Sequence, residues 1–129
     1  MIYEQYVLEA LTRSNVFENN GGTHNGNPAL DQSSLISRLI HDIFGGEIRK
    51  TLNGKNWHFY NRLNGENIDF AASEARNLSR ENHLNDVPST TDETQKYFEQ
   101  EDYFTFYQRF VRAFEESVNL DKIRSHNLA

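Results

Sequence analysis

Cysteine is absent from the 129-residue chain. Its absence excludes disulfides, thiolate zinc sites, iron–sulfur clusters and a cysteine nucleophile. Long apolar runs are also missing: mean hydropathy is −0.79, and no stretch reaches the roughly 18 to 20 apolar residues of a membrane span. The N-terminus lacks the basic and apolar regions of a signal peptide, so we expect a cytoplasmic protein without a membrane partner.

Positive charge is in deficit, with 13 Lys and Arg against 19 Asp and Glu and a net charge of −6. A negative chain repels phosphate backbones, so nucleic acid is not expected as a partner. A small molecule, a peptide or another protein remains as the expected substrate class. With 36% hydrophobic and 25% charged residues, the composition is that of a soluble globular protein, and we expect one domain over residues 1–129.

The region around residues 35–44 predicts a central amphipathic helix, because its apolar residues recur at helical spacing. Asp31, Ser33 or Ser34 can cap its N-terminus, and residues 45–46 are the two glycines expected to end it. The apolar positions are Leu35, Ile36, Leu39, Ile40, Ile43 and Phe44. We expect this helix to be buried.

After the two glycines, the spacing of apolar residues changes from helical to a period of two, which is typical of strands. Strands are predicted at 47–52, 56–63 and 66–70, and Asn64-Gly65 is a strong hairpin signal between the last two. Helices are predicted at 2–13, 71–78, 92–98 and 101–119, with loops at 15–30 and 79–91. The predicted fold class is α+β, with the central helix packed on a small antiparallel sheet and further helices towards the C-terminus.

The hairpin places a histidine and an aspartate on the same face of the predicted sheet. If residues 64–65 form a two-residue turn, Asp69 lies opposite Tyr60. Side chains alternate along a strand, so His58 shares a face with Tyr60 and is a diagonal neighbour of Asp69. We expect the Asp69 carboxylate to accept the Nδ1 proton of His58 and to leave Nε2 as the reactive nitrogen.

Ser33 is expected in the first turn of the central helix, which packs against this sheet. A helix N-terminus has partial positive charge and free N–H groups, which stabilise an anionic nucleophile or an oxyanion. The order is then a nucleophile at a helix start, a base (His58) on one strand and an orienting acid (Asp69) on the next. Papain-like and transglutaminase-like enzymes have this arrangement, with cysteine as the nucleophile.

Three segments together match the pattern of a known family. They are DQSSLISRLIHDIFGGEI at 31–48, WHFYNR at 57–62 and ENIDF at 66–70. They resemble the YunG-like family of small, functionally uncharacterised bacterial proteins, whose pattern is a Gln-Cys helix start, a Gly-Gly-Glu helix stop, a His-Tyr-Trp-Asn-Arg strand and an Ile-Asp strand. The resemblance covers residues 28 to 70, which is less than half of the chain.

The resemblance implies a site of four residues. Gln32 matches the glutamine of the pattern, Ser33 the cysteine, His58 the histidine and Asp69 the aspartate. In such a site, Gln32 would donate to an oxyanion alongside the backbone N–H of Ser33. Serine at the cysteine position is the departure from the family pattern.

Serine changes the expected chemistry. A thiol with a pKa of about 8.5 is readily converted to thiolate by a helix start and an imidazolium, whereas a hydroxyl requires general-base removal of its proton. We therefore interpret the chain as papain-like or transglutaminase-like, with a degenerate or Cys-to-Ser-substituted hydrolase or acyl-transfer site. If the site is active, we expect Trp57, Tyr60 and Asn61 to line its cleft.

Structural roles account for the same residues without catalysis. Ser33 can be a plain N-cap, and His58 can be a half-buried strand histidine. Asp69 requires a partner because acids are disfavoured within strands, and Arg62 competes with His58 for that role. The alternative function is a non-catalytic binding or interaction protein of an immunity or regulatory type.

No cofactor or metal site is expected. His24 and His41 lack metal-ligand spacing with other histidines or acids. His41 and Asp42 are expected on the solvated face of the central helix. The glycines at 21–22 lack the lysine and the preceding strand of a phosphate-binding loop.

Overall fold

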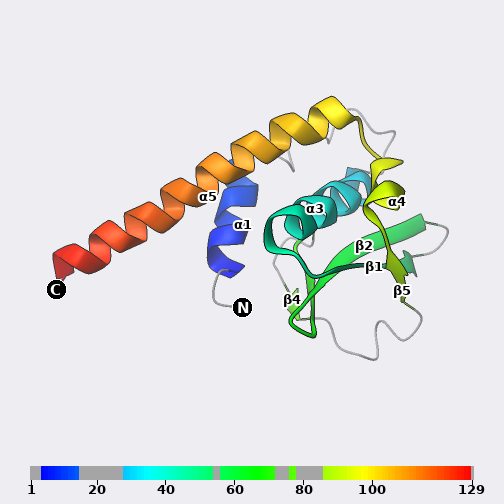
Figure 1. Cartoon of the computed structure of the whole chain (residues 1–129), viewed down its shortest axis with the longest axis horizontal. Coiled ribbons are helices and arrows are strands. Elements are labelled where there is room, and N and C mark those ends of the chain that lie inside the picture. Colours follow the sequence, from blue (N-terminus) through cyan, green and yellow to red (C-terminus); the bar gives the residue numbers. More distant parts are fainter. Residues whose placement is uncertain (1–3, 15–27, 54–55, 72–75, 78–85, 129) are drawn as a thin grey trace.

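The computed structural model describes residues 4–14, 28–53, 56–71, 76–77 and 86–128, and within them a five-stranded sheet packs against helices (Figure 1). The strands pair antiparallel in the order β4-β3-β2-β1-β5. Their bounds are β1 Glu47–Asn53, β2 Asn56–Leu63, β3 Glu66–Asp69, β4 Arg76–Asn77 and β5 Val87–Ser89. The helices are α1 Glu4–Arg13, α3 Pro28–Phe44, α4 Thr91–Gln95 and α5 Gln100–Leu128. The fold class is α+β, as predicted.

The buried central helix is confirmed as α3, but it begins earlier than expected. Leu35, Ile36, Leu39 and Ile40 are all buried in the core. The first helical residue is Pro28, a favourable position for proline because the missing N–H would have no partner in the helix. The predictions that residues 28–30 belong to a loop and that the helix is capped near Ser33 are therefore wrong.

The hairpin between β2 and β3 has the predicted register. Asn64 has φ 52° and Gly65 has φ 81°, the left-handed pair that a type I′ turn requires. Asn61 pairs with Ile68, which is the register in which Asp69 approaches Tyr60. The sequence pattern thus located this part of the sheet correctly.

Two strands were not expected. β5 lies in the predicted loop 79–91 and pairs with the open edge of β1, where Ile48 is opposite Ser89. β4 lies in the predicted helix 71–78 and pairs with β3, where Asp69 is opposite Arg76. Both strands are too short to have a hydrophobic period, and proline in β5 is tolerated because the strand is at the sheet edge.

The helix α3 lies between the sheet and the pair α1 and α5 (Figure 1). Residues of these three helices and of β2 and β3 form one buried cluster, including Leu11, Leu39, Ile68 and Phe110. Among the described residues, no helix has both the length and the apolar character that crossing a membrane requires.

The predicted helices at the C-terminus differ from the structure mainly in their ends. α4 stops at Gln95, short of the predicted 98, whereas α5 continues to Leu128, well beyond the predicted 119. Residues 2–3, 15–27, 72–75 and 78–85 of the predicted elements lie outside the described residues, and so do His24 and the glycines at 21–22.

Candidate functional site

His58 and Asp69 form a close pair across β2 and β3. His58 Nε2 donates to Asp69 Oδ2 at 2.6 Å. The other carboxylate oxygen, Oδ1, accepts from the backbone N–H of Ala71 at 3.0 Å. The side chains of His58 and Asp69 are 24% and 11% exposed, so the imidazole is fixed in direction while part of it still reaches solvent.

The ring nitrogen in this pair is the opposite of the predicted one. We expected Nδ1 to face the carboxylate, but Nε2 does so. Asp69 is a diagonal neighbour across the strand pair, and the distal nitrogen of the ring is the one that reaches it. In a neutral imidazole that donates from Nε2, Nδ1 is an acceptor, so it is the nitrogen that can take a proton.

The competing partner for Asp69 has other contacts. Arg62 Nε donates to Asn67 Oδ1 at 2.6 Å, and Arg62 Nη2 lies 3.4 Å from Asp86 Oδ2. Asp86 also bonds Arg49 Nη2 at 2.6 Å. The purely structural ion pair of Arg62 with Asp69 is therefore not formed. Nothing in the sequence pattern pointed to Asp86, which precedes the short strand β5.

Ser33 reaches β2 at the point where β3 ends. Its Oγ accepts from the backbone N–H of Phe59 at 3.2 Å. In the observed register this N–H points towards the position of Phe70, but β3 stops at Asp69. The N–H therefore has no partner in the described sheet, and a buried N–H requires another acceptor. Ser33 provides it, and its side chain is completely buried.

The contact joins Ser33 to the backbone of β2 next to His58, and not to the histidine ring. Phe59 N belongs to the peptide that links His58 to Phe59, so Ser33 Oγ is one peptide away from His58. Among the hydrogen bonds of the described residues, none joins Ser33 Oγ directly to the His58 ring. His58 and Asp69 lie on the face of the sheet away from α3, because Asn61 points towards α3 and donates to the Ser37 carbonyl, and side chains alternate along β2.

Serines allow α3 to approach β2 this closely. Ser37 lies one helical turn after Ser33, and its carbonyl accepts from Asn61 Nδ2 at 3.0 Å. Both serines are buried. Because Ser33 lies inside α3 instead of at its start, its backbone N–H belongs to the helical hydrogen-bond ladder. The expected help from a free helix N-terminus is thus absent at Ser33.

The other predicted site residues occupy different environments. Gln32 is buried at 7% exposure, next to Ser33 in the chain. Asn61 and Tyr60 are each 1% exposed and point to opposite faces of β2, because strand side chains alternate. Trp57 is half-buried, with Lys50 Nζ 4.4 Å from its ring centroid. The expectation of a single cleft lined by Trp57, Tyr60 and Asn61 is therefore not met.

Lys50, which contacts the Trp57 ring, also forms an ion pair with Glu93 of α4. Lys50 Nζ lies 2.5 Å from Glu93 Oε2, and this hydrogen bond holds the pKa of Glu93 below its ordinary value.

On the other side of α3, the Tyr103 hydroxyl donates to Asp42. Burial, helped by this bond, raises the pKa of Tyr103. Within the described residues, no group of three or more His, Asp or Glu is placed to hold a metal ion.

Comparisons with known proteins concern most of the chain. A family model described as "YunG protein" matches residues 7–115. The "Uncharacterized protein YunG" of Bacillus subtilis (strain 168) is 32% identical over 85 residues, which cover 66% of this chain and 71% of that protein. No solved structure matches. The extent of the family match and the identity to this relative show that the chain belongs to the YunG family.

Proposed function

We propose that the chain carries a degenerate site of the cysteine-hydrolase or acyl-transfer type, on a papain-like or transglutaminase-like arrangement of helix and sheet. Ser33 occupies the position of the nucleophilic thiol. The observation that supports this proposal is the His58–Asp69 pair, held at 2.6 Å on the face of the sheet away from α3, together with Ser33 Oγ, which accepts from the N–H of the next residue, Phe59. A carboxylate–imidazole pair on adjacent strands, with a helix-borne hydroxyl bonded to the neighbouring peptide N–H, has the composition of a nucleophile, a base and an orienting acid.

Each residue has a defined role in this proposal. Asp69 holds the imidazole by Nε2, and Nδ1 of His58 is the base. Gln32 is the candidate oxyanion donor, because it is adjacent to Ser33. A serine in this frame is not ionised by a neighbouring imidazolium as a thiol is. We therefore expect the site to bind an acyl or amide group of a small molecule, peptide or protein with little turnover.

One observation favours a second candidate, a non-catalytic binding or interaction protein. Ser33 is completely buried, and its oxygen already accepts the N–H of Phe59. In this alternative the serine only provides a hydrogen-bond acceptor for the Phe59 N–H, and the His58–Asp69 pair stabilises the pairing of β2 with β3. The two candidates differ in what a thiol at position 33 would do.

Replacement of Ser33 by cysteine tests the proposal. The proposal requires that, in Ser33→Cys, the imidazole held by Asp69 reaches the thiol and draws it towards the thiolate, which is the form that reacts. We expect iodoacetamide at about pH 7 to label this variant about tenfold faster than an ordinary buried cysteine, since a lower thiol pKa raises the thiolate fraction more than it lowers nucleophilicity. Labelling is followed by mass spectrometry of the intact chain.

Two control variants make the result specific. Ser37→Cys places a thiol one turn further along the same buried face of α3, away from the His58–Asp69 pair, and should react slowly. The double variant Ser33→Cys, His58→Ala should lose the rate advantage. Equal rates for Ser33→Cys with and without His58, or a rate no higher than that of Ser37→Cys, would contradict the proposal and favour the binding protein.

A further inference from the structure

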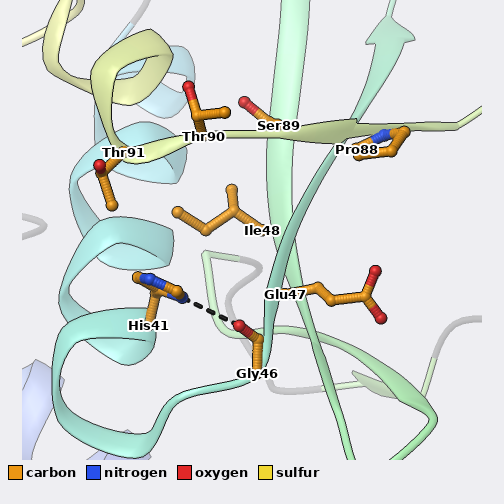
Figure 2. A pocket seen from close by; sticks show the side chains of 8 residues that line it. All are labelled: His41, Gly46, Glu47, Ile48, Pro88, Ser89, Thr90 and Thr91. Carbon is orange, nitrogen blue, oxygen red and sulfur yellow. Dashed lines mark hydrogen bonds between the residues drawn. The ribbon is translucent and has the colours of Figure 1, made fainter.

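A pocket of about 350 Å³ lies at the other end of α3 from Ser33. It is bounded by the C-terminal half of α3, the start of β1, the strand β5 and the start of α4 (Figure 2). Its volume is at the lower end of the range for small-molecule sites. The lining residues are His41, Gly46, Glu47, Ile48, Pro88, Ser89, Thr90 and Thr91.

His41 is held in one orientation at this pocket. Its Nδ1 donates to the carbonyl oxygen of Gly46 at 2.9 Å (Figure 2). A carbonyl only accepts, so the proton of the neutral ring is on Nδ1, and Nε2 is an acceptor. We expected His41 and Asp42 on the solvated face of the helix; Asp42 is exposed, and His41 is half-buried where the chain turns back beside it at Gly46.

The turn that presents the Gly46 carbonyl is itself fixed. Gly46 has φ 78°, and a Cβ at this position would lie 2.6 Å from the carbonyl oxygen of Arg62. A glycine is therefore required there for both conformation and space. The orientation of His41 thus depends on a tightly constrained part of the backbone.

The remaining groups at the pocket are mostly apolar or already bonded. Ile48 extends between His41 and β5, whereas Glu47 points away from His41 (Figure 2). The Ser89 hydroxyl donates to Glu93 Oε1, and the Thr90 hydroxyl accepts from Glu93 N. A ligand here meets an apolar wall and the acceptor nitrogen of His41.

We propose that this pocket binds a small neutral molecule that has an apolar body and one hydroxyl or N–H group. The apolar body packs on Ile48, and the hydroxyl or N–H donates to Nε2 of His41. The site does not involve Ser33, His58 or Asp69, so it stands independently of the function proposed above. No covalent step is required.

Phenol and anisole, used with the full chain, test this proposal. Both have an aromatic body, but anisole carries a methyl group where phenol has its donor. At about pH 8, we expect millimolar phenol to shift the backbone amide signals of Gly46, Ile48 and Thr91 in a saturable manner. Because one hydrogen bond separates the two ligands, phenol should bind about tenfold more tightly than anisole.

His41→Phe provides the matched variant, since it keeps a ring but removes the acceptor. We expect its affinity for phenol to fall about tenfold and its affinity for anisole to stay within about twofold. The comparison of the two ligands on the unmodified protein needs no variant, so a folding defect in His41→Phe would leave the proposal testable. Equal binding of phenol and anisole, or shifts scattered outside the pocket, would overturn it.

Discussion

The two oxygens of Asp69 serve different partners, His58 Nε2 through Oδ2 and the Ala71 N–H through Oδ1. One oxygen thus ties two strands together, and the other holds the chain where it leaves β3. A hydrogen bond with a charged partner in a partly buried site contributes more than a neutral one at the surface. This pair is accordingly expected to be energetically coupled.

A double-mutant cycle measures that coupling. Asp69→Asn keeps an oxygen for the Ala71 N–H but loses the charge, and His58→Gln removes the ring. We expect each single variant to lose about 1–2 kcal/mol in the free energy of unfolding, and the double variant to lose about 1 kcal/mol less than the sum. Urea denaturation gives these values. Additive losses would show that the two side chains do not interact.

Glu93 makes a contribution to the free energy of unfolding that depends on pH, and the direction of its pKa shift gives the sign of that contribution. Its pKa lies below the ordinary value, chiefly through the hydrogen bond from Lys50. A lowered pKa in the folded state stabilises the protein above the ordinary value of 4.5, and this stabilisation is lost as pH falls through the folded-state pKa. The Glu93 side chain is 35% exposed, so the effect is moderate.

We expect Glu93→Gln to lower the Tm at about pH 6 by roughly 2–4 °C and to have progressively less effect as the pH approaches about 3. Thermal melts followed by circular dichroism at several pH values test this. The exposed Glu99, replaced by glutamine, is the control and should give no such pH-dependent difference. A Glu93→Gln effect of equal size at all pH values would contradict the assignment.

At the scale of elements, the connection between α3 and β1 depends on two consecutive glycines with different surroundings. Gly45 and Gly46 both have positive φ, 80° and 78°. A Cβ at Gly45 would meet no atom within 4 Å, whereas one at Gly46 would lie 2.6 Å from Arg62 O and from Leu63 Cδ2. The first glycine is therefore required for conformation alone and the second also for space.

The two alanine variants separate these requirements. Gly45→Ala should lower the free energy of unfolding by about 1 kcal/mol, the cost of a left-handed conformation for a residue with a side chain. Gly46→Ala should lower it by about 3 kcal/mol or more, because β2 backbone must move. Denaturant titrations of both variants give the comparison. Similar losses would mean that the contact with Arg62 O is easily relieved.

The strands that bear the candidate site were predictable because each depends on local signals. Alternation in 56–63 and the Asn64-Gly65 turn set the register, and the register brings His58 to Asp69. The strand β5 was missed because Val87–Ser89 forms only where the edge of β1 accepts it. The contact between Ser33 and the Phe59 N–H was missed for the same reason, since it depends on where β3 ends in space.

At the scale of the whole molecule, the first described helix, α1, packs against the last, α5. Val7 and Leu11 are completely buried in the same cluster as Phe110 of α5 and Leu39 of α3. At the surface of the same contact, Arg13 pairs with Glu116 at 2.6 Å, with side chains 41% and 46% exposed. The apolar contacts, not this exposed ion pair, are expected to hold α1.

Leu11→Ala should lower the free energy of unfolding by about 2–4 kcal/mol, and Arg13→Ala should change it by about 0.5 kcal/mol or less. Trp57, the single tryptophan, lies in the sheet and reports on a region remote from α1. If the chain unfolds as one unit, fluorescence of Trp57 and helical circular dichroism should shift together in Leu11→Ala. Separate transitions would contradict a single domain.

The sequence by itself determined the α+β class, the buried stripe of α3, the β2–β3 hairpin and its register, because side-chain periodicity and left-handed turn residues act over a few neighbouring positions. Only the tertiary structure decided which ring nitrogen of His58 meets Asp69, that Ser33 lies inside α3 against the edge of β2, and that His41 borders a pocket. These features depend on distances between segments far apart in the chain, and such distances are set by packing of the whole core.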